Sequence, residues 1–467
     1  MNWRKGLLFF FELAFLFFIV SFFLTLGFDT SYQNHFRMVY GAILIVTFLC
    51  FLAKLSRDYS FKSLTGICFL LFLIFELARC FMAAWQIKFG NPTDEQALLF
   101  YYHLTAPLTW SVYFGVFALG FFLFRTRERA LRLLWVLVWC GFILAMNVLP
   151  PLLTKGHPGY AGPDGQSGFF YPLFYFHPLV SKYLMSRAGH VNYTGDVVAL
   201  GFFPALSLFL YALHRLGGTP KSSFIVEASH EISFASLGIP ATFAIASALA
   251  AILFFSRGTI MAFAASLVLY LLATVLKFPS RFQLGATGMA LLLLVGFFFW
   301  AGKPEAIWKE LQTVEGETDT TKETSFGTNR EGAQRALALY KAHPFWGAGT
   351  EGYAEFSIRF ATRGTEKNLM ARVRAMCHYL QLLAEEGVGA FVYFLFVIAY
   401  FLEVGWGLLW TKSRFQFLAG LSLVMGVAMV LAHAAINHLM QQFSIASLVY
   451  ILMGASLGIL KKDFEHA

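Results

Sequence analysis

Residues 326–349 read FGTNREGAQRALALYKAHPFWGAG and form the centre of a polar segment in an otherwise strongly apolar chain. Thr328 and Glu331 have the spacing of a capping box, so we expect a helix to begin at Thr328. The stretch His343–Gly349 should end that helix, because proline disfavours its continuation and glycine permits a tight backbone. A second helical run, 376–387, then leads back into apolar sequence.

The remainder of the chain predicts an all-α polytopic membrane protein. Hydrophobic residues make up 58% of the 467 and charged residues only 13%, whereas soluble proteins are about 25% charged. Apolar runs of about 18 residues or more are typical of membrane-spanning helices, and they lack the alternation of barrel strands. We expect about 12 spans, near 7–28, 38–55, 63–85, 105–124, 131–153, 197–214, 235–255, 259–276, 284–301, 387–410, 416–436 and 443–460.

The distribution of lysine and arginine predicts the orientation of these spans. Basic residues gather in the short connections that are cytoplasmic if the N-terminus is cytoplasmic, and such a bias sets topology. Both termini are therefore expected inside. Residues 1–301 would hold nine spans with a smaller outer segment near 154–196, residues 302–386 a large outer loop with helices, and residues 387–467 the last three spans.

Two arginines stand out because they lie in or beside apolar runs, where charge is costly. Arg257 occupies a tight turn between two apolar helices. It either contributes to a functional site or extends to a lipid headgroup, and the residues alone leave both readings open. Arg79 follows Glu76 inside the third apolar run, and for these two we favour a structural ion pair.

The polar segment offers further candidates. Arg330 and Arg335 are five positions apart on one predicted helix and so face different directions. We expect Arg335 to be the solvent-facing one, while Arg330 is the better candidate for a groove at the membrane. His378 begins the second helical run, with Tyr379 and Gln381 beside it.

Together, these residues resemble the O-antigen ligase/polymerase family of bacterial envelope glycosyltransferases. The resemblance covers about 185–400 and is carried in order by Arg257 in FSRG, by Arg330 and the helix into HPFWGAG, and by YLQLLAEEG at 379–387. Asn192 and Tyr193 loosely match an earlier Gly…Asn-Pro-Asn stretch. One departure concerns the family's His-Asn pair, which would fall on Met376 and Cys377, whereas this chain has His378.

The resemblance implies a GT-C-like fold and glycan transfer at the periplasmic face of the bacterial inner membrane. The donor would be a glycan on undecaprenyl diphosphate, and the acceptor a sugar hydroxyl of lipid A–core or of another lipid-linked glycan. Arg257 and Arg330 would stabilise the leaving diphosphate, and His378 would accept or orient the acceptor hydroxyl. Further substrate contacts would come from the remaining polar candidates, Arg335, Asn192, Tyr379 and Gln381.

Several alternatives stay open at this stage. A polymerase that extends lipid-linked glycan, or a protein O-oligosaccharyltransferase, would use the same chemistry. A transporter of lipid-linked sugars, a different class of protein, would also need cationic side chains and many helices, although the sequence shows no paired repeats or broken helices. A structural scaffold is the remaining alternative. Glu317 and Asp319 have the spacing of a metal motif but lie in a polar, mobile-looking stretch, so we predict no metal, no cofactor and activity that resists chelators.

Overall fold

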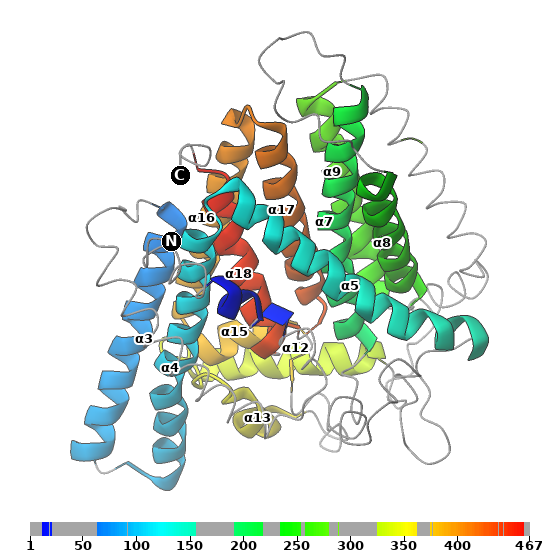
Figure 1. The fold of residues 1–467 in the computed structure, drawn as a ribbon. Helices are drawn as coiled ribbons and strands as arrows, with labels where there is room; N and C mark the ends of the chain where they lie inside the picture. Colours follow the sequence, from blue (N-terminus) through cyan, green and yellow to red (C-terminus); the bar gives the residue numbers. More distant parts are fainter. Residues whose placement is uncertain are drawn as a thin grey trace.

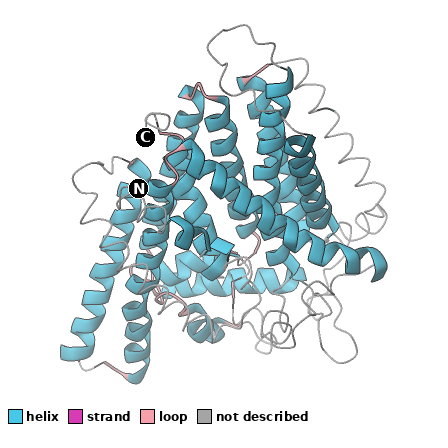
Figure 2. Cartoon of the chain, viewed as in Figure 1, coloured by secondary structure: helices cyan, strands magenta, loops and turns pink. Residues whose placement is uncertain are grey.

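The structure is a computed structural model. All regular secondary structure in its described part is helical (Figures 1 and 2). The residues it describes are 12–17, 19–20, 63–90, 92–155, 191–217, 234–253, 257–279, 288, 325–361, 374–375, 377–437, 439–441 and 443–461. Most of the long helices run roughly side by side, α5 runs obliquely across the front, and shorter helices lie near the lower part of the molecule in the view of Figure 1.

Seven helical segments in the described ranges are long and apolar enough to cross a membrane, and two shorter apolar segments accompany them. The chain is therefore a multi-pass membrane protein, as the sequence predicts. The helices that correspond to expected spans are α3 (Leu64–Phe89), α4 (Asp94–Leu123), α5 (Arg127–Lys155), α7 (Val191–Gly217), α8 (Phe234–Leu253), α9 (Arg257–Lys277), α16 (Gly389–Trp410), α17 (Arg414–Ala434) and α18 (Phe443–Ile459).

The three other expected spans, near 7–28, 38–55 and 284–301, lie largely outside the described residues. Two separate helices, α8 and α9, are present as expected, but Arg257 is the first residue of α9 and does not lie in a turn between the helices.

Pairs of helices approach each other closely at positions occupied by glycine. A Cβ atom on Gly454 of α18 would lie 1.9 Å from the backbone oxygen of Phe117 on α4. Gly141 of α5 and Gly201 of α7 meet in the same way, since a Cβ on Gly141 would lie 2.8 Å from the Cα of Gly201. Small residues let helix backbones approach within a membrane, where dispersion contacts stabilise the bundle.

A separate polar layer covers one end of the bundle. It contains α12 (Ser325–Ala342), α13 (Tyr353–Phe356), the 3-10 helix η1 (Ser357–Phe360) and α15 (His378–Glu386). These elements share a small apolar core of their own, and α12 lies crosswise beneath the long helices (Figure 1).

The predicted start of α12 was wrong. The helix begins at Ser325, so Thr328 lies inside it rather than at its N-cap. Glu331 forms an ion pair with Arg335 at 2.8 Å instead of closing a capping box. Oppositely charged side chains four residues apart stabilise a helix. Glu331 therefore stabilises α12 through its ion pair with Arg335 and not as part of a cap.

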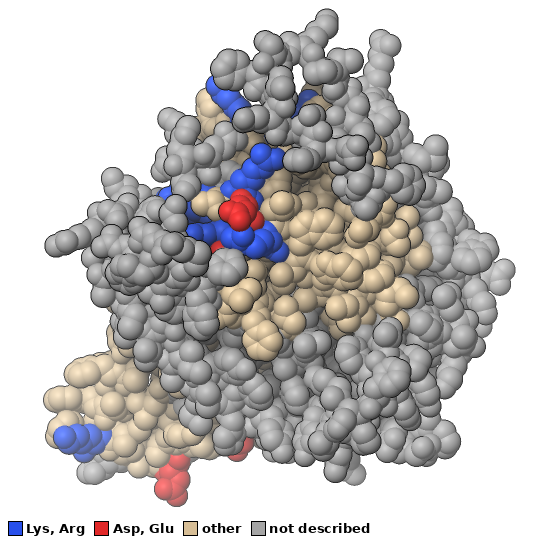
Figure 3. Space-filling view, in the orientation of Figure 1, with Lys and Arg blue, Asp and Glu red and all other residues tan. Residues whose placement is uncertain are grey.

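The opposite end of the bundle carries a cluster of basic residues. Arg132 of α5 forms an ion pair with Glu12 at 2.6 Å and another with Glu128 at 2.6 Å. Figure 3 shows basic side chains gathered around an acidic one high on this face, above a broad surface without charged side chains. Basic residues at one end of an apolar helix bundle are typical of a protein that spans a bilayer.

Candidate functional site

The turn at 343–349 and the end of α15 form one backbone unit. Ala348 N donates to Ala384 O at 2.9 Å, and Val388 N donates to Phe345 O at 3.0 Å. Gly347 adopts φ 69°, and a Cβ there would lie 2.1 Å from the backbone oxygen of Glu385. The glycine is therefore required both for its conformation and for the close approach of the two segments. The sequence predicted the break of α12 at this turn, and the structure confirms it.

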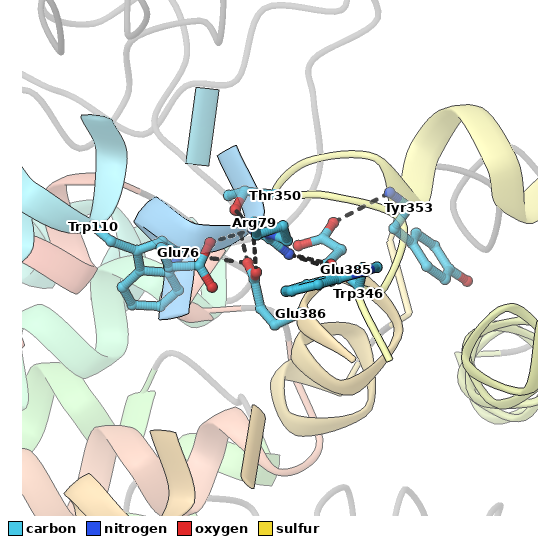
Figure 4. A network of polar contacts seen from close by, with 8 residues as sticks. All are labelled: Glu76, Arg79, Trp110, Trp346, Thr350, Tyr353, Glu385 and Glu386. Atoms are coloured by element: carbon cyan, nitrogen blue, oxygen red, sulfur yellow. Dashed lines mark hydrogen bonds and ion pairs between the residues drawn. The ribbon is translucent and has the colours of Figure 1, made fainter. Parts of the chain in front are cut away.

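Arg79 ties this unit to the third helix (Figure 4). It forms ion pairs with Glu76, its neighbour on α3, and with Glu386 at 2.6 Å. The same guanidinium donates to the backbone oxygens of Trp346 and Glu385, each at 3.0 Å. With Arg79 only 1% exposed, the predicted ion pair with Glu76 is confirmed, and it belongs to a larger network.

Two more side chains complete the network. Glu386 accepts hydrogen bonds from Thr350 Oγ1 at 2.7 Å and from Trp110 Nε1 at 3.4 Å. Trp110 belongs to α4, so the network joins two long helices to the polar layer. A fixed arginine with so many partners is suited to hold the layer on the bundle.

Glu385 lies beside this network and carries its own proton at neutral pH. Burial, and secondly the neighbouring Glu386, raise the pKa of Glu385 to about 8. Its Oε1 accepts hydrogen bonds from Gln381 Nε2 at 2.9 Å and from Tyr353 N at 3.3 Å. A protonated Glu385 removes one negative charge from a site in which a single arginine faces several carboxyl groups.

Arg335 is not solvent-facing, contrary to the sequence-based expectation. It is 0% exposed and pairs with Glu331. Tyr353 packs into the same small core and donates its hydroxyl to Gly332 O at 3.0 Å. The residues after the turn therefore fold back over α12 and bury the face that bears Arg335, whereas Arg330 remains exposed.

The start of α9 lies at the same end of the bundle as the polar layer. Thr259 Oγ1 lies 3.4 Å from Nδ1 of His433, in the last turn of α17. Just beyond α17, Asn437 O accepts a hydrogen bond from His378 N of α15 at 3.2 Å. The backbone of Arg257 is therefore at the end of the bundle that the polar layer covers.

Not every predicted site residue can be placed in full. The side chains of Arg257 and Asn192 lie outside the described part of the structure, although the backbones of both belong to helix starts, α9 and α7. Glu317 and Asp319 also lie outside it. Within the described ranges, no group of three or more His, Cys, Asp or Glu side chains could hold a metal ion.

His378 is the first residue of α15 and is 5% exposed. Its ring lies between two tyrosines, with centroid distances of 5.5 Å to Tyr379 and 6.1 Å to Tyr393. Neither ring nitrogen has a hydrogen-bond partner among the described residues. Burial lowers the pKa of His378 to about 4, so the imidazole is neutral at pH 7 and retains a nitrogen lone pair.

Tyr379 and Gln381 have structural partners. Tyr379 donates its hydroxyl to Leu431 O at 2.7 Å, which fixes α15 against α17. Gln381 Oε1 accepts from Ala375 N at 3.0 Å, while its amide nitrogen binds Glu385. Both side chains therefore hold His378 and its helix in place.

Sequence reasoning missed one buried polar group near the start of α9. Asp196 of α7 and His433 of α17 are in polar contact, with 2.7 Å between Oδ2 and Nδ1. An acid inside an apolar helix is a signal that the sequence does contain, because ionisable residues in spans mark functional sites by default. Its partner lies 237 positions away, and no sequence spacing indicates that contact.

A comparison with protein families finds one match to this chain. Residues 242–395 match a family described as O-antigen ligase. The matched range contains α9, α12, the turn at 343–349 and α15. A search of curated proteins finds no match.

Proposed function

We propose that this membrane protein transfers a glycan from undecaprenyl diphosphate to a sugar hydroxyl of lipid A–core, because residues 242–395 match a family described as O-antigen ligase. The observation that carries the proposal is the meeting, at one end of the bundle, of the start of α9, the polar layer and His378. A polyprenyl tail would stay in the bilayer while its diphosphate reached this end.

The cations suit a departing diphosphate. Arg257 opens α9, and the first backbone N–H groups of a helix are free to bind an anion. Arg330 is exposed on α12 and can supply a second guanidinium, whose planar fork matches phosphate oxygens. Negative charge grows on the diphosphate as the glycosidic bond breaks, so both groups stabilise the transition state more than the ground state.

His378 is suited to the acceptor side of the reaction. The acceptor hydroxyl oxygen attacks the anomeric carbon, the bond from that carbon to the phosphate oxygen breaks, and the diphosphate leaves with the electron pair. The hydroxyl proton passes to a ring nitrogen of His378, which is neutral and has no other described partner. The charge of the bound diphosphate would raise the pKa of this imidazole from its low value.

We also propose that this end of the bundle faces the periplasm. The opposite end carries the basic cluster around Arg132, and basic residues favour the cytoplasmic side of a membrane. With this orientation both termini are cytoplasmic, and the substrates are lipid-linked glycans on the outer leaflet of the inner membrane.

The first test is Arg257→Gln in a purified transfer assay with a lipid-linked donor and lipid A–core. We expect a fall in kcat of about 10²–10³-fold, the usual effect of losing one group that stabilises developing negative charge. Arg127→Gln, at the far end of the bundle, is the matched control and should transfer normally. Full activity of Arg257→Gln would refute the proposed diphosphate site.

The second test is His378→Phe, which keeps an aromatic ring between Tyr379 and Tyr393 but removes both nitrogens. We expect transfer to fall by about 10²–10⁴-fold, the range for general acid–base catalysis, with thermal stability preserved or increased. Stability should not suffer because the wild-type nitrogens are buried without described partners. An active His378→Phe enzyme would assign the proton to another group.

A polymerase remains the second candidate, because the family match covers ligase-type chemistry without identifying the acceptor. A cellular experiment separates the two. Deletion of a ligase leaves long lipid-linked polymer that never reaches lipid A–core, whereas deletion of a polymerase leaves single repeats on the core. Transfer by purified protein in detergent, without a gradient, would decide against a transporter.

A further inference from the structure

Two polar contacts join the same three helices, α7, α9 and α17, at different heights. At one, Asp196 Oδ2 binds His433 Nδ1 at 2.7 Å, with Thr259 Oγ1 3.4 Å from the same nitrogen. At the other, Ser207 Oγ lies 2.5 Å from Tyr270 Oη and donates to Leu418 O at 2.8 Å. We call these the acid–imidazole contact and the hydroxyl contact.

The hydroxyl contact joins these helices through neutral groups. Ser207 is 2% exposed and Tyr270 is 0% exposed, yet each is satisfied without charge. Asp196 and His433 are just as buried, at 0% and 2% exposure. Burying an acid costs more than burying a hydroxyl, and pairing often fails to recover the full cost of desolvation, so helix packing alone does not account for the acid–imidazole contact.

The position of His433 indicates what the contact serves. A Cβ atom built on Gly258 would lie 2.2 Å from Nε2 of His433 and 2.3 Å from its Cδ2. The edge of the imidazole therefore lies directly against the first turn of α9, one residue after Arg257. No side chain other than glycine would allow this approach without displacing the ring.

Asp196 in turn fixes the ring. Its Oδ2 lies 2.7 Å from Nδ1 of His433, and a carboxyl group hydrogen-bonded to one ring nitrogen sets the tautomer and orientation of an imidazole. The side chain of Thr259, in the first turn of α9, is also hydrogen-bonded to Asp196. A buried acid is expensive even when it is paired, which favours retention for function rather than for stability.

We propose that Asp196 and His433 form a positioning pair for the transferase: they fix the first turn of α9 and thereby hold Arg257 against the substrate diphosphate. This inference rests on the proposed function. The pair would act through Arg257 and the free N–H groups of the helix start, without taking part in bond making. A displacement of about 1 Å in such a group can cost about 10²-fold in rate.

The test is a double-mutant cycle between His433→Ala and Arg257→Gln. We expect His433→Ala to raise KM for the lipid-linked donor and to lower kcat/KM by about 10²-fold, with KM for the acceptor unchanged. If the pair acts through Arg257, the double variant should be no worse than Arg257→Gln alone. Independent, multiplying losses would overturn the inference.

Two further variants keep the test decisive. His433→Asn places an amide where Nδ1 stood, so this variant can still donate to Asp196. It should therefore be more active than His433→Ala. If His433→Ala fails to fold, His433→Asn takes its place in the double-mutant cycle. Equal losses in the two folded variants would overturn positioning and indicate chemistry at Nε2. Tyr270→Phe, which breaks the hydroxyl contact between α7 and α9, should leave kcat/KM unchanged, and a comparable loss there would reduce the effect to helix packing.

The outcomes separate this inference from the proposed function. Wild-type activity in Arg257→Gln would reject the diphosphate site itself, whatever His433 does. A strong loss in Arg257→Gln together with normal activity in His433→Ala would leave the transferase site standing and reject the positioning pair alone.

Discussion

Arg79 and Arg330 lie in opposite surroundings at the same end of the bundle. Arg79 is 1% exposed and binds two carboxylates and two backbone oxygens. Arg330 is exposed on the first half of α12. An arginine whose donors are used within the protein stabilises the fold, whereas an exposed one is available to a ligand. Charge near the membrane is therefore no guide to function until the partners of each guanidinium are known.

The largest effect should come from Arg79→Leu. Removing the guanidinium leaves Glu76 and Glu386 buried without their cation, and breaking a buried ion pair from one side costs about 3–5 kcal/mol. We expect the thermal unfolding temperature in detergent to fall sharply and the polar layer to become open to proteases. Arg79→Lys keeps the charge but loses the guanidinium that reaches Trp346 O and Glu385 O. Its stability should therefore lie between that of the wild type and that of Arg79→Leu. Unchanged unfolding in Arg79→Leu would mean that the network does not hold the layer.

Arg330→Gln should show the reverse pattern. An exposed substitution changes stability by no more than about 0.5 kcal/mol, while loss of a diphosphate contact should lower kcat by about 10²-fold. Lys341→Gln is the matched control, because it removes another exposed cation from the same helix. Both variants should unfold like the wild type, and only Arg330→Gln should lose transfer. If both retained full transfer, Arg330 would be an ordinary surface charge.

The sequence predicted most of the features that depend on local spacing. Apolar length identified the spans that the structure describes, proline and glycine identified the turn after α12, and the spacing of Glu76 and Arg79 identified their ion pair. Each of these follows from residues within one or two helical turns of each other, where geometry is known in advance. The capping box expected at Thr328 and Glu331 is the exception, because α12 begins at Ser325.

The features that depend on distant contacts were missed or mistaken. Arg335 is buried because Tyr353 and its neighbours fold back over α12, which no pattern within α12 indicates. Glu386 meets Trp110 across 276 positions, and His433 meets Asp196 across 237. The sequence does show that Asp196 is an acid in an apolar helix. Its partner, His433, could be found only from the arrangement of α7 and α17.

The smallest effect should come from the ionisation of Glu385, which lies beside the Arg79 network. Burial raises its pKa to about 8 in the folded protein, from an ordinary 4.5. Above pH 4.5 the unfolded chain has released this proton while the folded protein keeps it, so stability falls as pH rises until the folded group ionises near pH 8. Between pH 7 and pH 8 the free energy of unfolding should drop by about 1 kcal/mol from this group alone.

Glu385→Gln isolates that contribution. Glutamine keeps an oxygen to accept from Gln381 Nε2 and Tyr353 N, but it cannot ionise. Its unfolding temperature should therefore decline less between pH 7 and pH 8 than that of the wild type, and the two curves should converge toward pH 5. Parallel curves across that range would show that Glu385 is already ionised at neutral pH. Arg79 would then balance a further full negative charge, and the loss predicted for Arg79→Leu would be larger, because three carboxylates instead of two would lose their cation.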